Sequence, residues 1–293
     1  MKRILRVRQV LAMAGIGSLV LASSLTAGAA SLKGTLNATD AALVPASYKS
    51  GTLQVATDAT YAPDESMKGT TMVGFDVDLM NAIAKTLGIK VQENNVTFDS
   101  ILAGIKSGRY DIGNSSFTDT KARQKQVNFV DYFQAGEGVY AKSTSKVTFK
   151  GFKSFCGLTV AVETSTVEQT DAQTAAKACS ASKKLKIDAF PTQTAANLAV
   201  LSGQASVGFV DSQVAGYIVA TVHGFKLVGN AVNVAPYGVA TAKTTAGEGL
   251  ALAIQAAIKT LIANGTYAAI LTKWGVSAGA LPSSKIVLNG ALS

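Results

Sequence analysis

Polar residues follow two short segments that have the composition of β-strands. The stretch Asn114 to Thr118 comes directly after the segment 110–113, and Asp211 comes directly after the segment 206–210. A hydroxyl group both donates and accepts hydrogen bonds, whereas an ionised carboxyl group only accepts them and can pair with a cation. Open parallel sheets bind ligands beyond the carboxyl ends of their strands. We therefore expect a ligand site at these two places.

The elements that must position these residues alternate along the chain. Helical periodicity separates short apolar runs that predict strands at 52–56, 91–96, 110–113, 158–162, 185–190 and 206–210. We expect Asp76 to cap a helix that ends at Gly88, and Asp99 to cap a shorter helix. Such alternation is typical of α/β folds with largely parallel sheets. Two series of this kind, the second beginning near residue 156, predict two similar α/β units.

The composition excludes several other classes of protein. Apolar residues make up 48% of the chain and charged residues 15%, so the chain can bury a core and is not a disordered segment. The net charge is +9, but basic residues are scattered among acidic ones without a basic aromatic stripe, which argues against nucleic-acid binding. Two cysteines and one histidine cannot form a structural zinc site of the ordinary type, and we expect no metal or other cofactor.

The first 30 residues predict a secretory signal peptide. Four basic residues precede an apolar run at 10–25, and Ala27 and Ala29 offer a small-residue cleavage site. A transmembrane anchor is the alternative, but the strongly apolar run is shorter than the ~20 residues that a spanning helix needs. No other run approaches that length, and no cysteine near the cleavage site could carry a lipid. We therefore expect a free protein in the periplasm or in the medium.

Both cysteines, Cys156 and Cys179, lie in the part of the chain that would be exported. Disulfides persist in the oxidising conditions outside the cytoplasm, so we expect a bridge between the two. Two separate buried thiols are the alternative, because the sequence does not give the distance between the two Cα atoms.

Four motifs occur in an order and spacing that characterise a known family. They are TDATYAP at 57–63, VGFDVDL at 73–79, SGRYDIGNSSFTDTKARQKQVNF at 107–129 and NGTYAAILTKWG at 264–275. From about Gly51 to Trp274 the chain resembles the extracellular solute-binding proteins of the polar amino acid type, which serve ATP-driven importers. The resemblance implies a type II periplasmic-binding-protein fold, in which two hinge strands join two α/β lobes and the ligand binds in the cleft between them.

The resemblance also implies how the chain is divided and what the protein does. The expected divisions are a signal peptide at 1–30, a linker at 31–50, lobe one at 51–142 plus 236–293, and lobe two at 143–235. The implied function is to bind a polar or basic L-amino acid and to deliver it to the membrane permease of an ABC importer. We expect the protein to act as a monomer.

In lobe one, Arg123 matches the family residue that holds the α-carboxylate of the ligand. A guanidinium group suits this role because its planar fork makes two parallel charge-assisted hydrogen bonds. Without the resemblance, Arg123 would be one more exposed cation in the basic stretch 121–125. Ser115, Ser116 and Thr118 match positions that offer hydroxyl and backbone groups to the ligand; ordinary loop and cap bonding is their alternative.

The remaining expected ligand contacts come from both lobes. Asp211 matches the acid that pairs with the α-ammonium group, although an acid at this place could instead cap the following helix. Tyr61 and Phe98 match aromatic positions that enclose the ligand side chain, and either could instead be plain core. Asp58 could meet a polar or cationic end of that side chain. In lobe two, Thr166 is the expected partner of the carboxylate.

Three residues depart from the family pattern. Asp64 stands where an aromatic residue is usual, Thr164 stands in place of a common glycine, and Val167 replaces a larger residue. The stretch Ser165 to Glu168 also predicts a capping box that opens a helix. Because these departures lie beside the expected site, the resemblance leaves the identity of the ligand open.

An enzyme is the main alternative, because the same fold hosts a few dehydratases and lyases that act on small carboxylic acids. Glu163 and Glu65 lie near the expected cleft, and a buried acid could act as a general acid or base. The lone histidine, His223, lies in a Val-His-Gly turn far from the site residues, and so we favour binding over catalysis. A further alternative is an adaptor that presents its closed, ligand-bound form to a receptor rather than to an importer.

Overall fold

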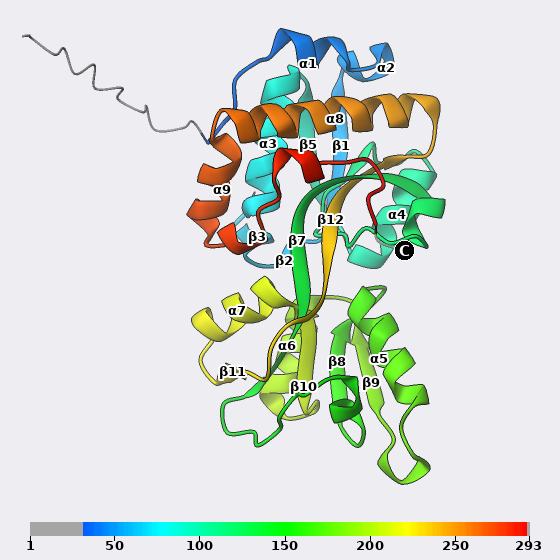
Figure 1. Ribbon diagram of the computed structural model, residues 1–293, viewed down its shortest axis with the longest axis vertical. Coiled ribbons are helices and arrows are strands. Elements are labelled where there is room, and N and C mark those ends of the chain that lie inside the picture. The colour runs from blue at the N-terminus through cyan, green and yellow to red at the C-terminus, as the bar shows by residue number, and fades with distance from the viewer. Residues whose placement is uncertain (1–31, 292–293) are drawn as a thin grey trace, which may run out of the picture.

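A computed structural model describes residues 32–291, and it consists of two α/β lobes stacked along the long axis of the molecule (Figure 1). The two-lobed architecture expected from the sequence is confirmed, whereas the expected signal peptide lies outside the described residues. A mixed sheet runs through both lobes in the strand order β5 (Lys90–Asn95), β1 (Thr52–Thr57), β6 (Ile112–Gly113), β12 (Val232–Ala242), β7 (Val127–Lys142), β10 (Val207–Asp211), β8 (Thr159–Glu163) and β9 (Lys186–Phe190).

Lobe one is the upper lobe in Figure 1, and its half of the sheet is mixed. β1 pairs in parallel with β5 and with β6, and β12 joins the sheet antiparallel to β6. A small second sheet lies at its lower edge. The other elements are β2 (Thr60–Tyr61), β3 (Glu65–Lys68), β4 (Thr71–Val73), α3 (Phe75–Leu87), α4 (Phe98–Lys106), α8 (Thr245–Ala263) and α9 (Thr266–Trp274).

The helix caps differ in detail from the sequence prediction. Gly88 ends α3 in the left-handed conformation as expected, but the N-cap position is Gly74, and Asp76 lies buried in the first turn. Similarly, Thr97 precedes α4, and its hydroxyl donates to Asp99 Oδ1 at 2.6 Å. Sequence alone could not separate a cap from a first-turn acid, because both positions suit the positive end of the helix dipole.

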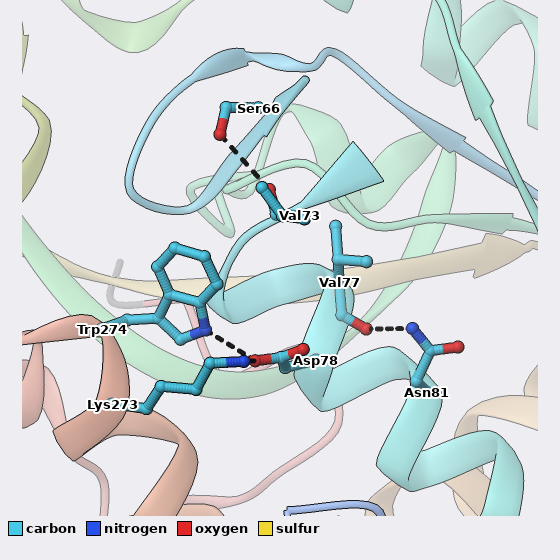
Figure 2. A network of polar contacts seen from close by, with 7 residues as sticks. All are labelled: Ser66, Val73, Val77, Asp78, Asn81, Lys273 and Trp274. Carbon is cyan, nitrogen blue, oxygen red and sulfur yellow. Dashed lines mark hydrogen bonds and ion pairs between the residues drawn. The ribbon is translucent and has the colours of Figure 1, made fainter. Parts of the chain in front are cut away.

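Two of the sequence motifs meet in lobe one. Asp78, near the start of α3, accepts hydrogen bonds from Lys273 Nζ at 2.6 Å and from Trp274 Nε1 at 2.7 Å at the end of α9 (Figure 2). The Lys273 ammonium group also lies over the indole ring of Trp274. This contact fixes the C-terminal helix on the first long helix, although 195 residues separate the paired side chains.

The segment 31–50, which we expected to be a linker, instead contains helices α1 (Ala38–Ala42) and α2 (Ala46–Lys49). The side chain of Asn37 caps α1 by accepting hydrogen bonds from the backbone of Thr39 and Asp40. Thr260 in α8 donates to Asp40 Oδ2 at 2.7 Å. The prediction failed because the segment is too short to show helical periodicity, and its helices are held by contacts with α8.

Helix α8 corrects the expectation that no segment beyond the signal approaches membrane-spanning length. Its 19 residues are long and apolar enough to cross a membrane by length and composition, and 44% of them are buried. Leu250, Ile254, Ile258 and Leu261 pack into the core of lobe one. An apolar helix of this kind is typical of a large core, in which a wide face is covered by neighbouring elements.

Lobe two contains the strands β8, β9 and β10 and the disulfide. β8 pairs in parallel with β9 and with β10. Cys156 and Cys179 form the expected bridge, with their Cα atoms 5.4 Å apart. The bridge joins the segment before β8 to the end of the following helix. The helices and the last strand of this lobe are α5 (Val167–Lys177), α6 (Gln193–Ser202), α7 (Ser212–Thr221) and β11 (Phe225–Leu227).

Strands β7 and β12 run from one lobe into the other (Figure 1). They pair with each other antiparallel, and β7 then pairs with β10 of lobe two between Glu137 and Tyr140. The register of β7 with β12 shifts between Val232 and Ala235, where the chain passes between the lobes. These strands correspond to the two expected connections; the lobe boundaries at residues 142 and 235 stay a prediction.

Replacing Cys156 and Cys179 together by serine should lower the free energy of unfolding by about 3 kcal/mol. The bridge closes a loop with a sequence separation of 23, and a loop of that length restricts the unfolded chain by roughly that amount. Urea unfolding of the exported protein and of the double variant would measure the difference. The oxidised wild type treated with reductant should behave like the variant, and equal unfolding free energies in oxidised and variant protein would contradict the prediction.

Candidate ligand-binding site

A cavity lies between the lobes, and all nine predicted ligand-binding residues line it. Lobe one contributes Asp58, Tyr61, Glu65, Phe98, Ser115, Ser116, Thr118 and Arg123, and lobe two contributes Glu163, Thr166, Val167, Glu168 and Asp211. The fold thus brings together residues that lie up to 153 positions apart in the sequence.

Arg123 is held in place from both lobes. Its Nη1 donates to the carbonyl oxygen of Thr118 and its Nη2 to that of Ser165, each at 2.9 Å. The guanidinium group lies 5.4 Å from the ring centroids of Phe98 and Phe117, which stack on each other. A guanidinium group has five donors, so these two bonds leave donors for a ligand carboxylate. Arg123 is therefore not an ordinary solvent-exposed cation, and its role as carboxylate partner stays a prediction.

The serines after β6 are bonded to acidic residues. Ser115 Oγ accepts from the backbone of Asp58 at 2.9 Å and donates to Glu65 Oε1 at 3.0 Å. Ser116 Oγ donates to Asp64 Oδ2 at 3.0 Å. Because each hydroxyl has only one hydrogen to donate, the two groups are better placed to accept from a ligand ammonium group than to donate to its carboxylate.

Buried acids lie behind these serines. Asp76 accepts hydrogen bonds from Tyr132 OH at 2.7 Å and from the backbone of Ser116 at 3.0 Å, and burial raises its pKa to about 6. Burial, followed by the charge of Asp76, also raises the pKa of Asp64 and of Glu65 well above the usual range. Of these three acids, Glu65 lines the cavity, and Asp64 and Asp76 lie behind it.

Asp64, one of the departures from the family pattern, bonds across the lobes. Its Oδ2 accepts from Gln213 Nε2 of α7 at 2.6 Å, and the same nitrogen lies 2.6 Å from Tyr237 OH of β12. An aromatic residue at this position could not accept such a bond. Sequence reasoning noted the substitution but could not supply its partner, which is 149 residues away.

Asp211 faces the cavity and does not cap the helix that follows it. It occupies the N-cap position of α7 without making a side-chain cap, and its Oδ2 accepts from Tyr61 OH at 2.8 Å. Burial raises the pKa of Asp211 to about 6, while hydrogen bonds from Tyr237 and Tyr61 and the charge of Arg123 oppose that rise. Asp211 therefore makes no side-chain cap, and its pairing with a ligand ammonium group stays a prediction.

The loop before α5 differs from the expected capping box by one residue. Thr166, not Ser165, is the N-cap, and its Oγ1 accepts from the backbone of Gln169 at 3.2 Å. Gln169 reaches back to the backbone of Ser165 at 2.8 Å, so it replaces Glu168 in the box. The Thr166 hydroxyl donates to the Glu163 carbonyl oxygen, which leaves the expected bond to a ligand carboxylate a prediction.

Four cavity residues were not among the predicted ligand contacts: Glu65, Glu163, Val167 and Glu168. Glu163 is the last residue of β8, as Asp211 is of β10, so the rule of strand ends could have identified it. Burial and then the charge of Asp58 in lobe one raise the pKa of Glu163. With Glu163 and Glu168 included, five carboxyl groups and one guanidinium group line the cavity.

Several hydrogen bonds join the lobes directly beside the cavity. The backbone of Gln193 in α6 donates to Thr60 Oγ1 of lobe one at 3.2 Å. The bonds of Tyr61 to Asp211 and of Arg123 to Ser165 also cross between the lobes. The structure therefore has the lobes closed on each other, as expected for a protein that binds its ligand between them.

Comparisons with known proteins agree with this geometry. The arginine-binding protein ArgT of Corynebacterium glutamicum is 32% identical over 219 residues, which cover 73% of this chain and 71% of that protein. An ancestral arginine-binding protein bound to arginine superposes with a TM-score of 0.71 at 32% identity, covering 77% of this chain and 99% of that chain. An ancestral amino acid-binding protein described as a precursor of cyclohexadienyl dehydratase gives a TM-score of 0.69 at 31% identity, covering 76% and 95%.

The sequence pattern of one family matches residues 53–277, which is most of the described chain and includes the two crossing strands and every residue of the cavity. The motifs quoted from the sequence fall inside this match. On these grounds, the chain belongs to the bacterial extracellular solute-binding proteins, family 3.

Proposed function

We propose that this protein binds a cationic L-amino acid, with arginine as the best candidate, and delivers it to the permease of an ABC importer. The charge of the cavity carries the proposal, because five carboxyl groups face one guanidinium group there. An amino acid's own carboxylate and ammonium groups need only one partner of each sign. The remaining carboxyl groups are stabilised in their ionised form only by a further positive charge, and a cationic side chain of the ligand supplies it.

The positions of the charged groups suggest how such a ligand would lie. Arg123 would hold the α-carboxylate with the guanidinium donors that its backbone partners leave available. Asp211 would pair with the α-ammonium group, assisted by the acceptor oxygens of Ser115 and Ser116. Phe98 would cover the aliphatic part of the side chain, whose charged end would point toward Asp58.

The comparisons support the same ligand class. The relative from Corynebacterium glutamicum is named an arginine-binding protein, and the ancestral protein of similar structure holds arginine. Both relatives align with most of the mature chain. Export to the periplasm or the medium, a monomeric state and a membrane permease as partner follow from the proposed role and from the signal peptide expected in the sequence.

We regard binding without turnover as the better account of the cavity acids. The structural neighbour described as a dehydratase precursor is itself an amino acid-binding protein. His223 is exposed on a turn, and it is not among the residues that line the cavity. Glu65 and Glu163 are accounted for by contacts with Ser115 and Asp58 and by the attraction of a cationic ligand. Incubation of the protein with bound amino acid, followed by mass spectrometry, should return the ligand unchanged.

The substitution Arg123→Ala should weaken arginine binding by well over about tenfold. A charge-assisted hydrogen bond contributes roughly 1.5–3 kcal/mol, and a bidentate pair contains two. Calorimetry on protein freed of carried ligand by unfolding and refolding would measure the loss. Arg123→Lys should give an intermediate loss, because it keeps the charge without the fork. Arg109→Ala, which removes a guanidinium group over Tyr110 outside the cavity, is the matched control and should bind normally.

Arginine affinity should fall as the pH is lowered from 8 to 5. The pKa of Asp211 is raised to about 6 in the ligand-free protein, and burial raises the pKa of Glu163 and of Glu168 well above the usual range. A cationic ligand favours the ionised carboxyl groups, so protons are released on binding and acid opposes it. Calorimetry in buffers of different ionisation enthalpy would count the protons. Proton uptake on binding, or an affinity that does not change with pH, would contradict the prediction.

A further inference from the structure

We infer that Glu163 is a specificity-determining residue, which forms with Asp58 a two-carboxylate clamp for the positively charged end of the ligand side chain. The inference deepens the proposed function and rests on it. Glu163 belongs to lobe two and Asp58 to lobe one, and both line the cavity. Burial and then the charge of Asp58 raise the pKa of Glu163, so the two carboxyl groups are close enough to interact electrostatically.

The lobe-one half of the clamp is fixed in position. Asp58 Oδ2 accepts from the backbone of Phe98 at 2.9 Å, and its Oδ1 accepts from the backbone and hydroxyl of Thr60 at 3.0 Å and 2.7 Å. Asp58 as a residue is 2% exposed. Asp58 therefore presents its negative charge to the cavity in one defined orientation.

The lobe-two half is incompletely bonded. Glu163 is also 2% exposed, and its Oε1 has no hydrogen-bond partner among the residues that the structure describes. A buried acceptor without a donor costs free energy, typically about 1–3 kcal/mol and more when it is charged. A ligand that brings N–H donors to this oxygen would remove that cost.

No cation of the protein balances the pair within residues 32–291. The salt bridges there join Lys186 to Asp188 and Lys273 to Asp78, so neither clamp carboxyl group takes part in one. The guanidinium group that lines the cavity belongs to Arg123, which lies over the Phe98 ring and donates to the backbone carbonyl groups of Thr118 and Ser165. Asp99 adds further negative potential at Glu163.

Two buried carboxyl groups that line the same cavity repel each other when both are ionised. A guanidinium or ammonium group that donates to both cancels the repulsion. A neutral amide or urea end would turn a carbonyl oxygen toward one of the two carboxylates and leave it unpaired. Because each lobe supplies one carboxyl group, a cationic end also favours the closed arrangement, whereas a neutral end does not.

Arginine and citrulline test this directly, because citrulline has nearly the same shape and replaces the guanidinium group by an uncharged urea. Calorimetry of both ligands should be done on wild type, Glu163→Gln and Asp58→Asn. Wild type should prefer arginine by at least about a hundredfold, and Glu163→Gln should reduce that preference at least about tenfold, mostly by weakening arginine. Asp58→Asn should do the same. Glu93→Gln, which alters a buried carboxyl group bonded to Thr57 outside the cavity, should keep the wild-type preference.

The ratio of the two affinities is measured on one protein sample, so a partly unfolded variant does not distort it. An arginine-to-citrulline preference in Glu163→Gln equal to that of wild type would overturn the clamp while leaving the proposed function intact. Failure of wild type to bind arginine, lysine or histidine would overturn the proposed function and the clamp together. Should Glu163→Gln fail to fold, the preference of Asp58→Asn decides in the same way.

Discussion

Five carboxyl groups and one guanidinium group face each other across a small cavity where the two lobes meet. Burial raises the free energy of the ionised carboxyl groups, and it therefore raises their pKa values, to about 6 for Asp211. The protein meets part of this cost internally, through hydroxyl donors such as Tyr61 and Ser115. In the proposed function, a ligand that carries positive charge offsets the rest of this cost.

The fold makes this concentration of charge possible because it divides the charges between two rigid bodies. Asp58 and Arg123 are fixed on lobe one, whereas Glu163 and Asp211 end parallel strands of lobe two. Opening the lobes would return these groups to water, and closing them would bury the groups again. β7 and β12 are the strands that run between the lobes and connect them. The free energy of closure depends on what occupies the cavity, because an occupant contacts both lobes.

Direct bonds between the lobes contribute to the same balance. Gln213 of α7 joins Asp64 of lobe one, and the backbone of Gln193 joins Thr60. Both bonds form beside the cavity rather than through a ligand. Asp64, which departs from the expected family pattern, thus supplies a polar contact across the lobes.

Much of the site followed from the sequence alone, for a local reason. Strand ends pointed to Asp211 and to the hydroxyl-rich stretch 114–118 from composition and spacing, whereas the binding roles of Ser115 and Arg123 were implied by the family resemblance. What required the tertiary structure were relations between distant segments: the bond of Asp64 with Gln213, the docking of α1 on α8, and the placement of Asp58 and Glu163 in one cavity. Local preferences determine strands and helix ends. The partner of a buried polar group depends instead on how the whole chain packs, and the spacing of residues in the sequence does not show which distant residues come together.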